Sequence, residues 1–484
     1  MATPIPSNQT SFSAEELRTL LGAPLGSGAT EAERAVTSVT TDSRAVVDGA
    51  LFVALVGETM DGHAFAKAAV EKGAAAVVLS RDVPDLSASV QRYVVPDTLV
   101  AWGNLAAHAL ARFRAADARR RVFMVTGSSG KTTTKEMLAE LLSLRGKTAR
   151  TAGNLNNRIG LPATIFALSS DAVYCVLEAG MSLPGEMALL AEIVRPDVST
   201  IVNVGLAHAE GVGGQEGVLR EKRAVYEYLR EEGVAVVNRD DAFVVRGAAE
   251  APQSARRVSY GRATLLPHGE GYRLLDRQVT GGGATLTIER ESGPSMEIAT
   301  PFPGEAQALD FLCALATAES VVPPFTTEEM ATALRNVTLT GRSTVHERPG
   351  DATVIDDSYN ANPSSMAASL RTAREMARHR GARLVAVLGE MKELGPFARK
   401  AHQELGEEVA AAGVSLFIGC GGLVSEALSV AEARGVRTLG AKDAAEAAIL
   451  ASREVYAKDV VLVKASRSVG AEEVVRALLA RRAP

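Results

Sequence analysis

Short apolar runs alternate with longer stretches of helical periodicity from about residue 120 to the end of the chain. Each run is rich in Val, Ile or Leu and is apolar on both faces, which is typical of strands in a sheet that is covered on both sides. Between the runs, as in 133–144, apolar residues recur at helical spacing. The alternation predicts βαβ units, and therefore parallel sheets with right-handed crossovers. The predicted strands are 122–125, 172–178, 198–204, 234–238, 353–356, 384–388, 416–418 and 460–463.

Two interruptions of this alternation divide the chain. One lies near residue 97, after an N-terminal block that has its own predicted strands at 51–55 and 75–79. The other extends from about 265 to 303, where GYRLL and ATLTIE are typical of antiparallel strands flanked by glycines. A further boundary is expected at 339–342, before the second set of βαβ units.

These breaks indicate a protein of several domains. At about 150 residues per domain, a chain of 484 residues is expected to form roughly three. We predict an α/β protein with an N-terminal α/β domain, a central parallel-sheet domain and a C-terminal Rossmann-like domain. The predicted bounds are 1–97, 98–340 and 341–484.

The composition excludes several functions. The 52 Lys and Arg against 57 Asp and Glu give a net charge of −5, which offers no basic footprint for nucleic acid. Aromatic residues make up 4% of the chain, which argues against a base-stacking surface. The cysteines, Cys175, Cys313 and Cys420, are widely spaced and predict buried thiols rather than a disulfide framework or a zinc site.

The N-terminus has no basic segment followed by an apolar run, so no signal peptide is expected. No apolar stretch reaches the roughly 18 residues that would cross a bilayer. We therefore expect a cytoplasmic protein without membrane insertion.

The sharpest local signal is the run TGSSGKTT at 126–133, which follows an apolar strand and opens a helical pattern. Glycines let backbone N–H groups face a phosphate, and the start of a helix adds the positive end of its dipole. Lys131 is expected to bind the β- and γ-phosphates, and the Thr132 hydroxyl is expected to bind Mg²⁺. Two residues separate the glycines, instead of the four of a standard P-loop. The run predicts a site for ATP or another nucleoside triphosphate, and a GTPase is disfavoured because no NKxD-type guanine-reading motif is present.

Two further polar residues follow predicted strands at the sheet edge where ligands bind. Glu178 ends one strand and His208 follows the next. An acid after a strand is as often a helix cap, and a lone histidine is more often structural than a ligand. Because they lie beside a phosphate loop, a metal-binding role and a structural role both stay open for these two residues. By contrast, Lys222 reads as an ordinary surface lysine on a charged helix.

Several runs together resemble the Mur ligase family, and within it the ligases that use D-alanyl-D-alanine. The similarity extends to the N-terminal segment 40–65 and the final segment 459–475, so it covers nearly the whole chain. The DSYNANP sequence separates these ligases from their sister enzymes. The runs that carry the resemblance are TGSSGKTTTKE (126–136), GNLNNRIGLP (153–162), VLEAGMSLPGE (176–186), NVGLAH (203–208) and DDSYNANPSSM (356–366).

The resemblance implies an ATP- and Mg²⁺-dependent amide ligase of cytoplasmic peptidoglycan precursor synthesis, active as a monomer. The carboxylate of UDP-N-acetylmuramoyl-tripeptide would attack the γ-phosphate of ATP, and the amine of D-alanyl-D-alanine would displace phosphate from the acyl phosphate. The N-terminal, central and C-terminal domains would then bind the UDP-muramoyl group, ATP and the incoming dipeptide, respectively. The sequence does not identify the third residue of the tripeptide, diaminopimelate or lysine.

The resemblance also assigns roles to individual residues. Thr132, Glu178, His208 and a carbamylated Lys222 would hold two Mg²⁺ ions. The catalytic set would be Lys131, Lys222, His208 and Glu178. Nucleotide contacts are implied for Gly127, Ser128, Ser129, Gly130, Lys131, Thr132, Thr133, Gln307, Asp310, Arg342 and Asp357. Contacts with the other substrates are implied for Ser43, Arg44, Asp61, His63, Asn156, Asn157, Asn360 and Asn362.

The sequence departs from the family at the adenine-side motif, usually Gly-x-His-Asn-x-x-Asn. Here 304–310 reads GEAQALD, so the histidine is lost and Gln307 and Asp310 replace the asparagines. Purine contacts are therefore expected to differ. Two alternatives stay open: another Mur- or folylpolyglutamate-type ligase, and a non-catalytic nucleotide-binding homologue. The DSYNANP run and the UDP-binding segment argue against the first, and only the altered motif supports the second.

Overall fold

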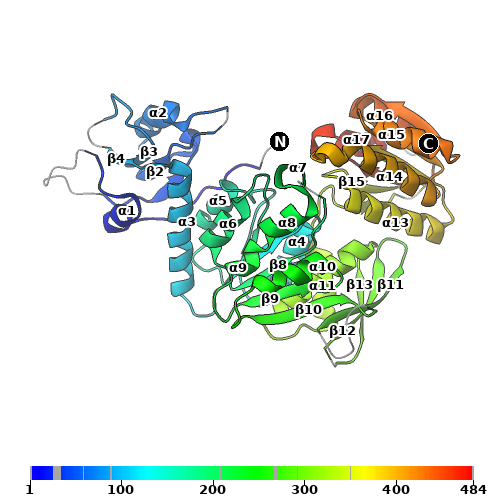
Figure 1. Cartoon of the computed structure of the whole chain (residues 1–484), viewed down its shortest axis with the longest axis horizontal. Coiled ribbons are helices and arrows are strands. Elements are labelled where there is room, and N and C mark those ends of the chain that lie inside the picture. The colour runs from blue at the N-terminus through cyan, green and yellow to red at the C-terminus, as the bar shows by residue number, and fades with distance from the viewer. Residues whose placement is uncertain are drawn as a thin grey trace. The chain divides into compact units, whose positions relative to one another are not determined.

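The computed structural model describes residues 3–25, 34–57, 59–87, 90–206, 209–264, 271–291, 293–348 and 350–481 (Figure 1). His208 therefore lies outside the described residues. The chain forms two compact units. The first contains Met1–Met124, Gly146–Met181 and Gly185–Asp197, and the second contains Val125–Arg145, Ser182–Pro184 and Val198–Pro484. Three sheets lie one within each predicted domain, whereas the domain bounds themselves stay a prediction.

The N-terminal sheet belongs to the first unit and is parallel throughout, in the order β1-β2-β3-β4. Its core contains Phe52, Val77 and Leu79, all fully buried. Two of its strands were predicted, whereas β1 is only three residues long and β4 carries the polar sequence QRYV. The strands are β1 (Ser38–Thr40), β2 (Ala50–Val53), β3 (Ala76–Leu79) and β4 (Gln91–Val94).

The central sheet has nine strands, and β5 (Arg121–Thr126) crosses from the first unit into the second. In the first unit the order is β5-β7-β6, and in the second it is β13-β12-β11-β10-β9-β8-β5. The strands from β8 to β11 are parallel, while β11, β12 and β13 are antiparallel, as GYRLL and ATLTIE predicted. The remaining strands are β6 (Thr148–Arg150), β7 (Tyr174–Glu178), β8 (Val198–Ile201), β9 (Val234–Asn238), β10 (Arg256–Arg262), β11 (Tyr272–Val279), β12 (Ala284–Arg290) and β13 (Met296–Thr300).

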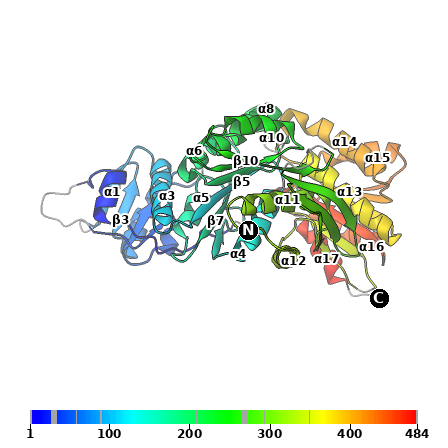
Figure 2. The ribbon, with the colours of Figure 1, turned by 90° about the horizontal axis from the view of Figure 1, so that it is seen from below.

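Helices cover both faces of the central sheet in the second unit. Figure 2 shows α8 and α10 on one side of β10 and α4 and α11 on the other. Helix α11 is buried along almost its whole length and packs against α4. The helices of this part of the unit are α4 (Lys131–Ser143), α7 (Ala209–Val212), α8 (Gly214–Lys222), α9 (Ala224–Glu227), α10 (Ala242–Gly247), α11 (Glu305–Glu319) and α12 (Thr327–Asn336).

In the first unit, Trp102 packs edge-on against Phe166 with ring centroids 4.7 Å apart, joining α3 to α5. The indole N–H of Trp102 donates to the Ile159 carbonyl over 3.1 Å, so this buried polar group is satisfied. The helices of this unit are α1 (Ala14–Leu21), α2 (Ala66–Glu71), α3 (Thr98–Ala115), α5 (Gly160–Phe166) and α6 (Glu186–Val194).

The C-terminal sheet has the order β14-β15-β19-β16-β17-β18, with only β14 antiparallel to its neighbour. Apolar cores lie on both of its faces, which explains why its strands are apolar on both sides. The strands are β14 (Thr344–His346), β15 (Thr353–Asp357), β16 (Leu384–Gly389), β17 (Leu416–Cys420), β18 (Arg437–Ala441) and β19 (Val460–Lys464). The helices are α13 (Pro363–Arg380), α14 (Ala398–Ala411), α15 (Val424–Ala433), α16 (Ala444–Glu454) and α17 (Glu472–Ala480).

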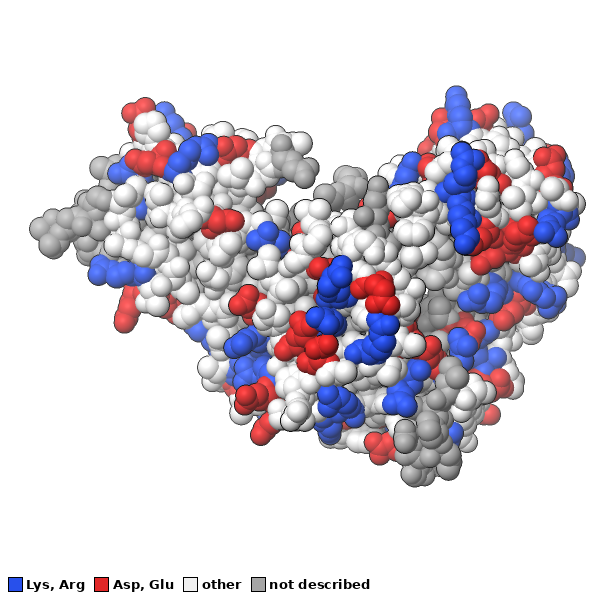
Figure 3. Space-filling model, in the orientation of Figure 1, with Lys and Arg blue, Asp and Glu red and all other residues white. Residues whose placement is uncertain are grey.

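Two features of composition can be followed in the structure. The three cysteines are free and buried, as predicted, and burial raises the pKa of each thiol. On the face shown in Figure 3, basic and acidic side chains are interspersed. Among the described residues, no helix is both long enough and apolar enough to cross a membrane.

Candidate functional site

The phosphate loop connects β5 to α4, so the predicted strand, loop and helix are present. Gly130 is the residue that caps α4, with a left-handed φ of 78° and no side-chain cap. Because glycine has no side chain, residue 130 cannot cap the first N–H groups of α4. A phosphate site requires this, since those N–H groups are the ones that bind the anion. A Cβ at Gly130 would lie 2.3 Å from Oδ1 of Asp310. Both the φ angle and the contact require glycine here.

A residue that the sequence did not single out, Asn203, holds this loop in shape. Its Oδ1 accepts hydrogen bonds from the backbone N–H groups of Ser128 (3.1 Å) and Ser129 (2.9 Å). Its Nδ2 donates to the carbonyl and the hydroxyl of Ser129. Part of the loop backbone is therefore already bonded within the protein. The signal was its position in NVGLAH, just after β8.

The polar side chains of the GKTT sequence lie at the start of α4. Nζ of Lys131 donates to the carbonyl of Gly127 over 2.7 Å, so the ammonium lies across the loop. Thr132 and Thr133 are 8% and 6% exposed. These positions match the predicted phosphate-binding arrangement, while the roles of the individual residues stay predictions.

Lys222 differs from its sequence-based interpretation as a surface lysine, which is wrong. It is 1% exposed at the end of α8, and its Nζ lies 3.5 Å from Oγ1 of Thr126, the last residue of β5. The side chain therefore reaches the base of the phosphate loop. Helical periodicity missed this because Lys222 shares the buried side of α8 with Val218 and Leu219, while Glu216 and Arg220 of the same helix are exposed.

In the first unit, Glu178 and Asn156 form a pair. Glu178 ends β7 with 2% exposure, and its Oε1 accepts a hydrogen bond from Nδ2 of Asn156 over 2.8 Å. Asn157 has a different position: its Oδ1 accepts from the N–H groups of Ile159 and Gly160 and caps α5. Of the two asparagines, Asn156 is therefore the one that contacts a predicted metal ligand.

The altered adenine-side motif begins at Gly304, which caps α11, and extends into the second turn of the helix. Gln307 and Asp310 are 8% and 6% exposed. Desolvation raises the pKa of Asp310 well above its usual range, although the hydroxyl of Thr134 and the guanidinium of Arg342 act in the opposite direction. Asp310 thus lies against the phosphate loop in surroundings that raise the pKa of its carboxyl group.

Asp310→Asn is expected to stabilise the protein, and more at pH 8 than at pH 5. Because the folded state binds this proton more tightly than the unfolded chain, the free energy of unfolding falls as pH rises from the ordinary aspartate range toward the raised pKa. Because asparagine does not titrate, the free energy of unfolding of the variant no longer falls with pH through this residue. Thermal unfolding at both pH values measures the effect, with the exposed Asp82→Asn as control. A gain that did not change with pH would contradict the raised pKa.

In the C-terminal sheet, Asp357 ends β15 and is held by three donors. Nζ of Lys464 lies 2.6 Å from its Oδ2, the hydroxyl of Ser369 donates over 2.5 Å, and the N–H of Ser343 donates to Oδ1 over 3.0 Å. Nζ of Lys464 also donates to the carbonyl of Asn360. Lys464 is thus a residue missed at the sequence level, hidden within an apolar strand.

The DSYNANP run extends from this strand toward the phosphate loop. Asn362 caps α13, and its Nδ2 donates to the carbonyl of Ser128 over 3.4 Å. The guanidinium of Arg342 lies over the ring of Tyr359, with its Cζ 4.0 Å from the centroid. The structure therefore brings Asn362 to the loop itself.

The N-terminal candidates fall into an exposed and a buried group. The Arg44 side chain is 87% exposed and pairs with Asp42, next to Ser43. His63 is 4% exposed: its Nε2 accepts from the N–H of Ser80, and its Nδ1 lies 2.6 Å from Oδ1 of Asp61. Since both ring nitrogens are engaged within the unit, the structure shows His63 as a support for Asp61.

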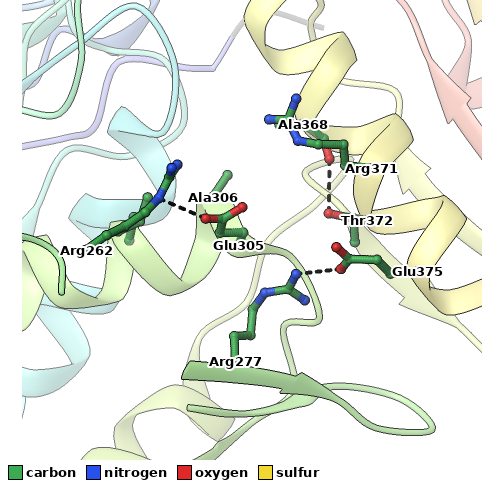
Figure 4. A pocket seen from close by; sticks show the side chains of 9 residues that line it. Arg262, Arg277, Glu305, Ala306, Ala368, Arg371, Thr372 and Glu375 are labelled. Atoms are coloured by element: carbon green, nitrogen blue, oxygen red, sulfur yellow. Dashed lines mark hydrogen bonds and ion pairs between the residues drawn. The ribbon is translucent and has the colours of Figure 1, made fainter. Parts of the chain in front are cut away.

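A polar cavity of about 110 Å³ lies at the start of α11 against α13 (Figure 4). Four of its charged lining residues form two ion pairs: Nε of Arg262 lies 2.9 Å from Glu305, and Nη2 of Arg277 lies 2.5 Å from Glu375. The second pair connects the central sheet to the helix that follows DSYNANP. None of the predicted site residues lines this cavity.

The donor chemistry fits Mg²⁺. The Thr132 hydroxyl and the Glu178 carboxylate supply hard oxygen atoms, and both residues are more than nine-tenths buried. Among the described residues, no group of three or more His, Cys, Asp or Glu is placed to hold a metal.

Comparison with known families gives three matches along the chain. Residues 35–109 match the Mur ligase family catalytic domain, 125–318 the Mur ligase middle domain, and 341–467 the Mur ligase glutamate ligase domain. The UDP-N-acetylmuramoyl-tripeptide–D-alanyl-D-alanine ligase of Escherichia coli K12 is 34% identical over 446 residues, 91% of this chain and 93% of that protein. The corresponding ligase of Bacillus subtilis 168 is 32% identical over 449 residues, again 91% and 93% of the two chains.

Solved structures agree. MurF from Acinetobacter baumannii has a TM-score of 0.85 at 28% identity, covering 98% of this chain and 100% of that one. MurF ligase from Thermotoga maritima in complex with ADP has a TM-score of 0.78 at 29% identity, covering 91% and 96%.

Proposed function

Since the chain belongs to the Mur ligase family, we propose that it joins D-alanyl-D-alanine to UDP-N-acetylmuramoyl-tripeptide at the expense of ATP. The observation that carries the proposal is the phosphate loop, with Lys131 across it, Lys222 at its base and Asn362 of the DSYNANP run hydrogen-bonded to it. The family matches and the relatives named for this reaction support the same assignment.

The first step activates the tripeptide. A carboxylate is a poor electrophile at neutral pH because hydroxide leaves badly, whereas an acyl phosphate has a good leaving group. Lys131 would exchange the Gly127 carbonyl for the β- and γ-phosphates and offset charge that develops during transfer. Gly127, Ser128, Ser129, Gly130 and Thr133 would surround the phosphates through their backbone and hydroxyl groups.

Mg²⁺ would reduce the repulsion between the triphosphate and the attacking carboxylate. We propose Thr132 and Glu178 as ligands of one ion, and His208 and a carbamylated Lys222 as ligands of a second. Asn156 would orient Glu178 through the hydrogen bond between their side chains. For Lys222, carbamylation would convert a buried ammonium into a carboxylate-like group, which resolves the presence of a cation where a metal ligand is expected.

Lys222→Ala is expected to lose most activity and to regain part of it with added acetate or another short carboxylic acid. The acid would replace the carbamate in the cavity left by the shortened side chain. Steady-state ADP release measured over a series of acetate concentrations tests this, with Lys131→Ala as a control that acetate cannot rescue. Absence of rescue at every concentration would contradict the carbamate assignment.

The remaining candidates would bind and orient substrates. Asp357 and Arg342 would contact the nucleotide, with Lys464 and Ser369 fixing the Asp357 carboxylate. Gln307 would lie on the adenine side of the nucleotide. Asp310, which lies next to Gly130, would support the phosphate loop. We propose the C-terminal domain, 341–484, as the site of the incoming dipeptide, near Asn360.

The N-terminal domain, 1–97, would bind the UDP-muramoyl group. Ser43 and Arg44 are placed for direct contacts, while Asp61 would be oriented by the buried His63. Asn157 would act through the start of α5, which it caps. We expect the enzyme to act as a cytoplasmic monomer, which light scattering of the purified chain would check.

Mass spectrometry of the reaction product tests the proposed function. The protein is incubated with UDP-N-acetylmuramoyl-tripeptide, D-alanyl-D-alanine, ATP and Mg²⁺, and a UDP-muramoyl-pentapeptide is expected. Parallel reactions with lysine- and diaminopimelate-containing tripeptides identify the third residue. A product formed only with a single amino acid as acceptor would instead indicate a different ligase of the family, and absence of any acceptor-dependent ADP release would indicate a non-catalytic homologue.

A further inference from the structure

Two arginines lie over the same aromatic ring at one edge of the C-terminal sheet. The Cζ atom of Arg342 is 4.0 Å from the centroid of Tyr359, and that of Arg467 is 5.3 Å from it. Both distances are within the range of cation–π attraction. The ring of Tyr359 is therefore in contact with two cationic side chains, each of which can bind an anion.

The guanidinium groups retain hydrogen-bonding capacity. In the part of the chain that the structure describes, Arg342 donates no hydrogen bond to a protein group. Nη1 of Arg467 lies 3.4 Å from Oε1 of Glu472, a long contact, and the Arg467 side chain is 48% exposed. Because arginine has a planar fork of donors that matches a carboxylate, Arg467 is suited to bidentate recognition of that group.

The position of this cluster is that of a ligand site. Tyr359 follows β15 and Arg467 follows β19, and these neighbouring strands are paired in parallel, with Asp357 opposite Lys464. In open parallel sheets, ligands bind beyond the carboxyl ends of the strands. Lys464 connects the two loops, since its Nζ bonds both to Asp357 and to the carbonyl of Asn360.

The same loop also reaches the phosphate loop. Asn362, three residues after Tyr359, donates to the carbonyl of Ser128. A dipeptide in extended conformation spans about 7 Å from its amine to its carboxylate. A molecule whose anion is held near Tyr359 would extend along this loop, in the direction of Ser128.

We propose that Arg467 binds the carboxylate of the incoming dipeptide, with Tyr359 holding the guanidinium in place. This inference rests on the proposed function. The triphosphate already has the loop at 127–133, and Arg342 is assigned to the nucleotide, which leaves Arg467 for the second anionic substrate. Once the attacking amine has lost its proton, the carboxylate is the only charge on the dipeptide, so anchoring it directs the amine toward the acyl phosphate.

The test compares D-alanyl-D-alanine with D-alanyl-D-alaninamide, which lacks the carboxylate, as acceptors for the wild type and for Arg467→Ala. In the wild type the amide is expected to have a kcat/KM about 10–100-fold lower, the range of a charge-assisted hydrogen bond. Arg467→Ala should lose a similar factor with the dipeptide and discriminate little between the two acceptors. The KM for ATP should change less than about twofold.

Two further variants make the result specific. Arg467→Lys keeps the charge but not the fork and should recover only part of the discrimination. Arg434→Ala removes an exposed arginine that pairs with Glu407 in the same domain, and it should behave as wild type. The inference would be overturned if Arg467→Ala discriminated between the dipeptide and its amide as strongly as the wild type does. A rise in the KM for ATP alone in this variant would also overturn it. A wild type that ligates neither acceptor would instead refute the proposed function.

Discussion

Lys131→Ala is expected to abolish acyl-phosphate formation and to reduce turnover by at least about 10³-fold. The ammonium lies across the phosphate loop, 2.7 Å from the Gly127 carbonyl, and we propose that it offsets charge on the transferred phosphoryl. Alanine leaves the loop backbone unchanged but removes that cation. The measurement is ADP release with UDP-N-acetylmuramoyl-tripeptide and ATP, together with trapping of the acyl phosphate by hydroxylamine.

The control for this variant is Lys147→Ala. Lys147 is an exposed lysine, paired with Asp171 on the surface, and its removal is expected to change neither ADP release nor trapping. An unchanged unfolding midpoint in Lys131→Ala would show that the loss is chemical rather than structural. Near-normal trapping in that variant would refute the role of Lys131.

Gly130→Ala is expected to weaken ATP binding by about 10–100-fold. Alanine in the left-handed region costs roughly 1–2 kcal/mol, and its Cβ would also lie 2.3 Å from Oδ1 of the buried Asp310. Relief of that contact requires the loop or α11 to move, which changes the cradle for the phosphates. Isothermal titration with a non-hydrolysable ATP analogue measures the effect.

Gly185→Ala separates the backbone cost of a left-handed alanine from the cost of the contact with Asp310. Gly185 also caps a helix with a left-handed φ, 82° against 78°, but nothing lies within 4 Å of the position that a Cβ would occupy there, so only the backbone cost applies. A second variant, Gly130→Ala with Asp310→Ala, removes the clash and should regain part of the affinity. Equal ATP affinity in Gly130→Ala and wild type would show that the loop tolerates the shift.

The fold was predictable where strands are apolar on both faces, because such runs have few alternatives to a covered parallel sheet. The predicted run 353–356 became β15, and 460–463 became β19. By contrast, β10 was missed because its sequence RRVSYGR carries three arginines and lacks the apolar pattern of a buried strand. Hydrogen bonds to its neighbours β9 and β11 hold this segment as a strand instead. Pairing between distant segments is not encoded in local periodicity.

The candidate site was predictable where a local motif carries the chemistry, as in the phosphate loop. It was not predictable where a role depends on tertiary contact. Asn203 is one asparagine among many until the fold places its amide against Ser128 and Ser129. The burial of Lys222 and the raised pKa of Asp310 likewise follow from packing that no single segment contains.

The bonds from Asn203 to the phosphate loop have a consequence for the catalytic cycle. Backbone that folds into shape once, when the polypeptide is made, need not be ordered again each time a nucleotide arrives. The side chain of Asn203 thereby moves the entropy cost of ordering the phosphate loop from each ATP-binding event to the folding of the protein. Weakening it should make ATP capture slower and more temperature-sensitive, even though no atom of Asn203 is required in the chemistry itself.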